Sequence, residues 1–131
     1  MIDRMQELLE AERAGVKCLL AMVEGTAEGE KKDFLARLCN DEGRFCAGLF
    51  RLIAARGATP GKQVGAFADK VLALAGEGER LALLVKGQSW VVRKIDEIPQ
   101  AEMTGEEKAF FADMREAHVV NIEACRKYLP G

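Results

Sequence analysis

The stretch Asn40-Asp41-Glu42-Gly43-Arg44-Phe45-Cys46 lies in the middle of a long helical pattern and sets a carboxylate where an apolar side chain is expected. This helix is predicted over Glu30–Arg56, and Glu42 falls on its apolar stripe, which recurs every three or four residues. A carboxylate buried without a partner is costly, so Glu42 needs a proton, a hydrogen bond or a cation. The identity of that partner decides between a metal centre and a charged structural core.

The rest of the sequence predicts an all-α protein. Aromatic residues make up only 6% of the chain, and Ala, Leu, Glu, Lys and Arg dominate, which favours helix throughout. Glycines and prolines separate the helical patterns, Gly57 is a natural C′ residue, and Thr104 with Glu107 forms a capping-box signal. Long helices are expected at Asp3–Glu24, Glu30–Arg56, Glu79–Ile98 and Gly105–Tyr128, with a shorter helix at Val64–Ala75.

Loop lengths predict how these helices are arranged. The short turns after Glu24 and after Ile98 each favour an antiparallel hairpin. The segment between the hairpins has about 20 residues, including the short helix, which is enough to run the length of a bundle. We therefore expect a single domain over residues 1–131, a four-helix bundle of two antiparallel hairpins joined by a crossover containing a short helix. An up-down-up-down bundle is the alternative.

Charge and composition narrow the classes of partner. The net charge of −2 and the pI near 5.5 give no reason to expect nucleic acid or an anionic membrane surface. No apolar run approaches the roughly 20 residues that span a bilayer, and we interpret the protein as cytoplasmic. Its four cysteines are expected to be reduced and packed as small hydrophobic residues. A homodimer formed through an apolar helix face is the expected assembly, with Trp90 in that interface or in the core.

Glu12 is a second carboxylate on an apolar stripe. Reflecting the first hairpin about its turn near residue 27 brings position 12 opposite position 42. Two carboxylates buried at one level repel each other and lose hydration. Glu12 and Glu42 are therefore expected to share their partners.

The surroundings of these two residues resemble the rubrerythrin-like branch of the ferritin-like superfamily. The resemblance extends over the whole chain as a pattern and is clearest at Leu8-Leu9-Glu10-Ala11-Glu12-Arg13-Ala14-Gly15 and at Asp41-Glu42-Gly43-Arg44-Phe45. In that family each hairpin brings a Glu on its first helix and, about 30 residues later, a Glu-x-x-His on its second. Two hairpins together hold a pair of irons. The resemblance implies a ferritin-like four-helix bundle and an iron-dependent oxidase or peroxidase that activates dioxygen or peroxide.

Only three of the six ligand positions implied by the resemblance carry residues that can bind metal: Glu12, Glu42 and His118. Phe45 stands where the first His would be, and a phenyl ring cannot ligate a metal. The iron pair of the family is therefore incomplete in this sequence.

Cations stand at the two remaining positions. Arg115 lies three residues before His118, and counting back 29 residues from it places Lys86 at the position of the last Glu. Both cations would repel iron and attract carboxylates, and an Arg fork can hold a carboxylate through two hydrogen bonds. We therefore expect a metal-free central charge cluster of Glu12, Glu42, Lys86 and Arg115, in a bundle protein that acts in assembly or in binding a ligand or partner.

A different register of the third long helix leaves a second hypothesis open. Gln88 lies two residues from Lys86 and could point inward instead, whereas Glu77 and Glu79 are more distant oxygen donors. The two central glutamates and the histidine would then form a mononuclear site suited to iron, manganese or zinc. This alternative is a metal-dependent oxidase or peroxidase.

The cysteines allow two further hypotheses. Cys46 follows Glu42 by one helical turn and could add a thiolate to a metal site, which would favour zinc or iron. A redox sensor that uses Cys39 or Cys46 would need an exposed thiol with a low pKa. The apolar stripes around both residues argue against such exposure.

Overall fold

The computed structural model describes residues 1–130, which contain helices and no strands. The elements are α1 (Ile2–Glu24), α2 (Glu30–Ala55), α3 (Phe67–Leu72), α4 (Glu77–Asp96), η1 (Gln100–Glu102), α5 (Gly105–Cys125) and η2 (Arg126–Tyr128). The all-α prediction is confirmed, although α3 has only six residues, half the expected length. Among residues 1–130, no helix combines the length and apolar character needed to cross a membrane.

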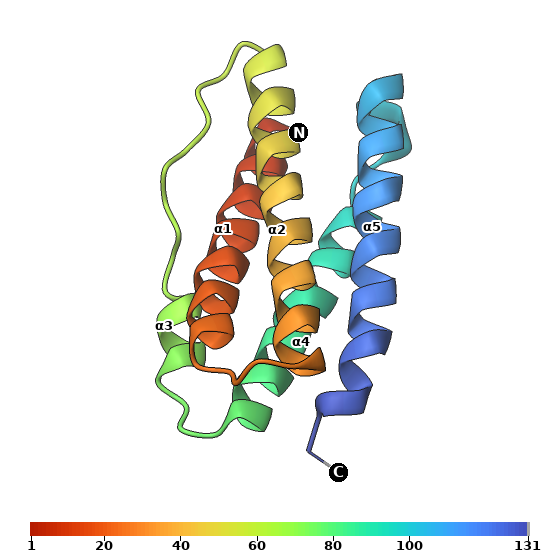
Figure 1. The fold of residues 1–131 in the computed structure, drawn as a ribbon. Helices are drawn as coiled ribbons and strands as arrows, with labels where there is room; N and C mark the ends of the chain where they lie inside the picture. Colours follow the sequence, from red (N-terminus) through yellow and green to blue (C-terminus); the bar gives the residue numbers. More distant parts are fainter. Residues whose placement is uncertain (131) are drawn as a thin grey trace.

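The long helices form two antiparallel pairs (Figure 1). The first pair is α1 with α2 and the second is α4 with α5, while α1 also contacts α4 and α2 also contacts α5. After α2, residues 57–66 form an extended strap that returns along the outside of α1 to α3. Because the strap runs nearly the whole length of the bundle, α2 and α4 point in the same direction (Figure 1).

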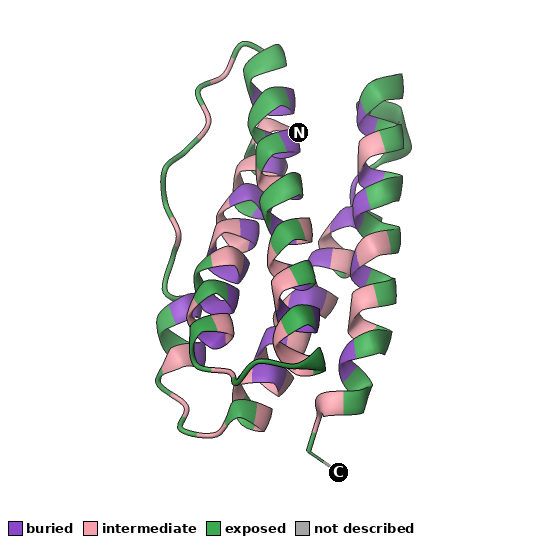
Figure 2. Cartoon of the chain, viewed as in Figure 1, coloured by how far each residue is buried: buried purple, intermediate pink, exposed green. Residues whose placement is uncertain are grey.

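Two apolar clusters fill the space between the helices, and buried residues line the inward faces (Figure 2). One cluster includes Leu8, Phe45, Val91 and Met114, one residue from each long helix. The other includes Cys18, Leu38, Leu84 and Cys125, again from all four. Along each helix a short interval separates the two clusters, and four of the five buried polar residues lie in it.

The sequence signals at the helix ends are confirmed. The Thr104 side chain accepts a hydrogen bond from the Glu107 N–H at 3.1 Å, and the Thr104 N–H donates to Glu107 Oε1 at 3.0 Å. Gly57 follows α2 with φ of +82°, a left-handed conformation that suits glycine. These signals fix where α5 begins and where α2 gives way to the strap.

Candidate metal centre

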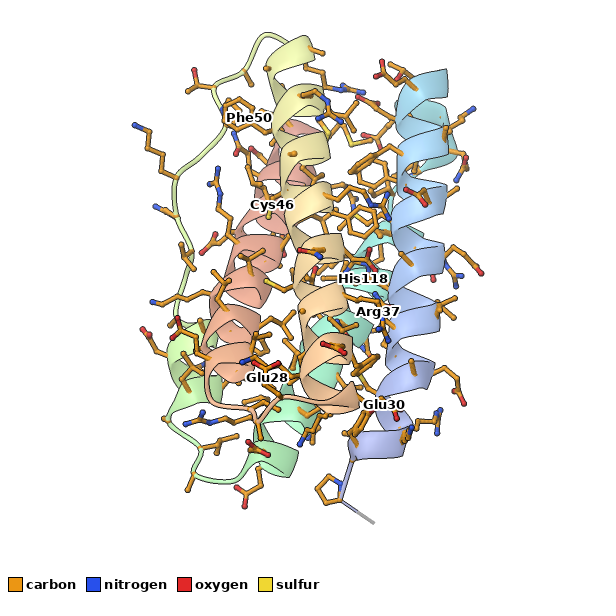
Figure 3. All side chains as sticks on the ribbon, in the orientation of Figure 1. Glu28, Glu30, Arg37, Cys46, Phe50 and His118 are labelled. Atoms are coloured by element: carbon orange, nitrogen blue, oxygen red, sulfur yellow. The ribbon has the colours of Figure 1, made fainter. Side chains whose placement is uncertain are left out.

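Four buried polar side chains, one from each long helix, meet at the level between the two apolar clusters. They are Glu12 of α1, Glu42 of α2, Gln88 of α4 and His118 of α5, and each is at most 4% exposed. Each lies on the inward stripe of its helix, between apolar neighbours one turn away on either side. Figure 3 shows His118 directed from α5 toward the interior of the bundle.

The ligand atoms of three of these residues converge. His118 Nε2 lies 2.7 Å from Glu12 Oε1 and 3.5 Å from Glu42 Oε2. One ligand atom from each residue lies within 4.8 Å of the others. Despite these short distances, Nε2 and both of these oxygens lack a hydrogen-bond partner, so the contacts are close without the geometry of hydrogen bonds.

The backbone orients the His118 ring. Nδ1 lies 2.8 Å from the carbonyl oxygen of Met114, which can only accept a hydrogen bond, so Nδ1 carries the hydrogen. In the neutral ring, Nε2 then presents a lone pair to the two carboxylates. Three electron-rich groups then face one another and repel unless a cation lies among them, either a metal ion or a second proton on the ring, whose Nε2 lies 2.7 Å from Glu12 Oε1. A histidine whose Nδ1 hydrogen is held by a carbonyl is typical of metal-binding histidines.

The fourth side chain and one glycine complete the surroundings of Glu42. Gln88 Nε2 donates to Glu42 Oε1 at 3.5 Å, while Gln88 Oε1 has no hydrogen-bond partner. A β-carbon at Gly15 would lie only 2.8 Å from Glu42 Oε1. Gly15 therefore provides the space in which the Glu42 carboxylate lies.

Comparison with known families covers nearly the whole chain. Residues 1–127 match the family described as domain of unknown function (DUF6306). The chain belongs to the DUF6306 family. No curated protein and no solved structure matches it. The chemistry of this DUF6306 protein is therefore inferred from its own geometry.

The charge cluster expected in the centre is not formed in the DUF6306 protein. Arg115 is exposed and donates to Asp96 at 2.6 and 3.2 Å, and Lys86 is also exposed. Helix geometry gives the reason, since each residue turns by about 100°. Gln88 shares the buried stripe of α4, so Lys86, two residues earlier, points away from the centre. Arg115 likewise follows the buried Met114 and turns outward.

The other oxygen donors considered on α4 also lie away from the centre. Glu77 and Glu79 are in the first turn of the helix, where both are exposed, and Glu77 pairs with Lys31 at 3.1 Å. The register with Gln88 inward is therefore the one that the DUF6306 protein adopts. The sequence feature that indicates this register is the helical spacing of the buried residues of α4, which are Leu81, Leu84, Gln88, Val91 and Ile95.

Phe45 and the cysteines add no ligand. Phe45 is fully buried, and its ring centroid lies 5.5 Å from that of His118, so it packs against the histidine. Burial raises the pKa of the Cys46 thiol to about 11 and also raises the pKa of Cys39. Both thiols are therefore protonated at neutral pH, which argues against a thiolate ligand and against a redox sensor.

A cavity of about 530 Å³ adjoins the cluster between α1, α4 and the end of the strap. Glu12, Glu42 and Gln88 contribute to its lining together with apolar side chains, while both Glu12 oxygens and Glu42 Oε2 are themselves closed off from solvent. The sequence reading missed this cavity. The one feature of the sequence that accompanies the cavity is a set of small residues on the facing helices: Ala11, Ala14 and Gly15 on α1 and Gly87 on α4.

Proposed function

We propose that this DUF6306 protein binds one divalent transition-metal ion between Glu12, Glu42 and His118, and that the ion acts on a small molecule held in the adjoining cavity. The observation that carries the proposal is a group of five buried atoms without hydrogen-bond partners among residues 1–130: Glu12 Oε1 and Oε2, Glu42 Oε2, Gln88 Oε1 and His118 Nε2. Buried polar atoms are nearly always paired, and the contacts of His118 Nε2 with the two glutamates lack hydrogen-bond geometry, so the group supports a missing ligand at this point.

The spacing of the donor atoms supports a single ion. Two atoms bound to one ion at about 2.1 Å, with angles of 80° to 110°, lie roughly 2.7–3.5 Å apart. The distances from His118 Nε2 to Glu12 and Glu42 span the same range. Two carboxylates also balance the charge of a divalent ion in apolar surroundings. Two oxygen donors and one imidazole suit iron, manganese or zinc.

The residues fit one ion better than two. A pair of irons would need further acids and a histidine, but Phe45 fills one such position, and Lys86 and Arg115 lie at the surface. The expectation of a metal-free centre rests on these two cations and on Phe45; with Lys86 and Arg115 at the surface, it loses the proposed central charge cluster. The strap between the hairpins, with donors from three long helices, supports a ferritin-like bundle whose iron pair is reduced to a single site.

Each residue of the cluster has a definable role. A bound ion would supply Lewis acidity or one-electron redox chemistry. Glu12 and Glu42 would hold the ion and neutralise it, and the Met114 carbonyl would keep His118 in the tautomer that presents Nε2. Gln88 would orient Glu42 through its amide. The apolar clusters on both sides exclude water from those faces of the site. Together with the resemblance to the rubrerythrin-like branch, a single metal site supports a metal-dependent oxidase or peroxidase.

Metal content tests the proposal. Protein purified without chelators, incubated with iron, manganese or zinc and then desalted, should retain about one ion per chain by mass spectrometry. Glu42→Gln and His118→Gln should retain less than a tenth of that amount. Arg115→Gln is the matched control, because it alters an exposed residue and should leave the metal content unchanged. Wild-type protein without metal, or Glu42→Gln with a full complement, would contradict the proposal.

A further inference from the structure

We propose that the cavity takes a small organic anion with an apolar body, whose charged group binds at Lys86 and Arg93 and whose apolar end reaches Glu12 and Glu42. That a metal ion then acts on this apolar end rests on the proposed function. Binding of the anion rests only on the cavity and on its charges.

The size and walls of the cavity suit such a molecule. Its volume of about 530 Å³ lies within the roughly 300–1,000 Å³ of small-molecule sites. Small residues on α1 and α4 make the space, and Val64, Phe67, Leu84 and Val91 give it apolar walls. Phe67 reaches α4 so closely that a β-carbon at Gly87 would lie 2.7 Å from its ring. These walls favour an apolar body over a polar one.

Exposure distinguishes the two ends of the cavity. Glu12, Glu42 and Gln88 line it and are buried, so they mark the inner end. Lys86 and Arg93 also line it but are exposed, so they mark the mouth. A ligand that fills the cavity therefore places one end beside the carboxylates and the other beside two cations.

The charges at the mouth favour an anion on the α4 side. Lys86 and Arg93 are seven residues apart on one side of α4, and neither forms an ion pair within residues 1–130. Four carboxylates also line the cavity: the buried Glu12 and Glu42, and the less buried Glu7 and Glu10 on α1. Glu7 is paired with Lys94 at 3.8 Å, and Glu10 lies against Gly65 of the strap, where a β-carbon would meet its carboxylate at 2.6 Å. The positive charges of α4 are thus available to a ligand.

Two fluorescent probes with nearly the same apolar body test the inference. Anilinonaphthalene sulfonate carries a negative charge, and N-phenylnaphthylamine does not. Replacing both mouth cations, Lys86→Gln with Arg93→Gln, should weaken binding of the sulfonate about tenfold, because charged groups at such a mouth attract it. Binding of the neutral amine should change less than twofold. The control Arg51→Gln with Lys108→Gln removes the same net charge from exposed positions outside the cavity and should affect neither probe.

Blocking the cavity shows where the probes bind. Val64→Trp adds bulk from the strap and should abolish binding of both probes while circular dichroism stays unchanged. Ala66→Trp, at an exposed position that also lines the cavity, provides the same test if the first variant fails to fold. Equal losses of both probes on removal of the cations, or full sulfonate binding after blocking, would overturn the inference. Titrations on chelator-treated and metal-loaded protein keep this result separate from metal binding.

Discussion

Gly15 is the residue whose small size most directly shapes the candidate metal centre. It lies one turn after Glu12 on α1 and faces the end of the Glu42 side chain, where a β-carbon would come within 2.8 Å of Oε1. The obstructing atom belongs to the flexible end of a side chain, so a larger residue would displace the carboxylate rather than the helices. Gly15 therefore controls the position of a donor without being one.

Gly15→Ala should reduce metal affinity at least tenfold while the protein stays folded, because the displaced carboxylate no longer shares an ion with His118. Gly43→Ala is the matched control: it lies on α2 beside Glu42, and a β-carbon there meets nothing within 4 Å. The control should keep full affinity and gain up to about 1 kcal/mol of stability from helix propensity. Calorimetric titration of both variants with Mn²⁺ or Zn²⁺ measures the two affinities. Equal affinities would show that Gly15 does not control the position of the Glu42 carboxylate.

Arg115→Ala should lower the free energy of unfolding by less than about 1 kcal/mol, because its pair with Asp96 is exposed to solvent. The central charge cluster expected from the sequence would instead require a loss of about 3–5 kcal/mol, since a buried carboxylate would lose its partner. Urea denaturation of wild type and variant separates the two values. A loss of several kcal/mol would show that Arg115 is buried and pairs with a central carboxylate.

The periodicity within each helix predicts which residues of the candidate site face the interior. Glu12, Glu42 and His118 lie on apolar stripes, and the structure brings them together. Counting residues from Arg115 predicts Lys86 inward, whereas the buried stripe of α4 includes Gln88. The partner of a buried donor depends on register between helices, and periodicity within one helix does not determine it.

At the level of elements, polar contacts hold α5 against α2. Glu107 at the start of α5 accepts two hydrogen bonds from Arg56, both at 2.7 Å, and Arg44 and Asp113 pair at 2.6 Å. Near the cluster, Asn121 donates to Asp41 at 3.0 Å. These contacts set the position of α5, and therefore of His118, relative to Glu42.

The pair of Arg56 and Glu107 should make stability depend on pH. Hydrogen bonds from Arg56 hold the pKa of Glu107 below its usual value of 4.5. Because the folded-state pKa is the lower one, this stabilisation is present above pH 4.5 and is lost as the pH falls through the folded-state pKa. Glu107→Gln should cost about 2 kcal/mol at pH 7 and lose less stability than wild type on acidification.

Urea denaturation at pH 7 and at pH 3.5 measures this difference. Glu102→Gln is a suitable control, because that side chain is exposed at the same end of the bundle and only its carbonyl accepts from Arg56. The control should follow wild type at both pH values. An identical loss of stability in Glu107→Gln and wild type would show that the pair contributes nothing to the pH dependence.

For the whole molecule, the polar layer between two apolar clusters is costly to bury, and the proposed function predicts that a bound ion offsets this cost. Without metal, replacing the three donors by apolar residues of similar volume, Glu12→Met, Glu42→Met and His118→Leu, should leave stability unchanged or raise it by about 1–4 kcal/mol. With metal at 100 times its Kd, wild type should gain about 2.7 kcal/mol and the triple variant nothing. Thermal unfolding with and without chelator checks both outcomes. A triple variant much less stable than metal-free wild type would indicate a structural network instead.

The fold was more predictable than the site. Helix positions follow from periodicity and caps, and the length of the crossover allowed it to run along the bundle, as it does. The cavity arises from small residues on α1 and α4 that are distant in sequence, so no local pattern indicated it. Homodimerisation stays a prediction: the large exposed apolar side chains lie on three different helices, Leu20 on α1, Phe50 on α2, and Val119 and Val120 on α5.

Anomalous diffraction from crystals grown with Mn²⁺ or Zn²⁺ would test the central claim most directly. The proposed function predicts a single peak in the interior, at about 2.0–2.2 Å from His118 Nε2 and from oxygens of Glu12 and Glu42. Two peaks a few ångströms apart would instead indicate a pair of metal ions, as in the rubrerythrin-like branch. A map with no interior peak, and with the three donors bonded only to one another or to water, would contradict the account.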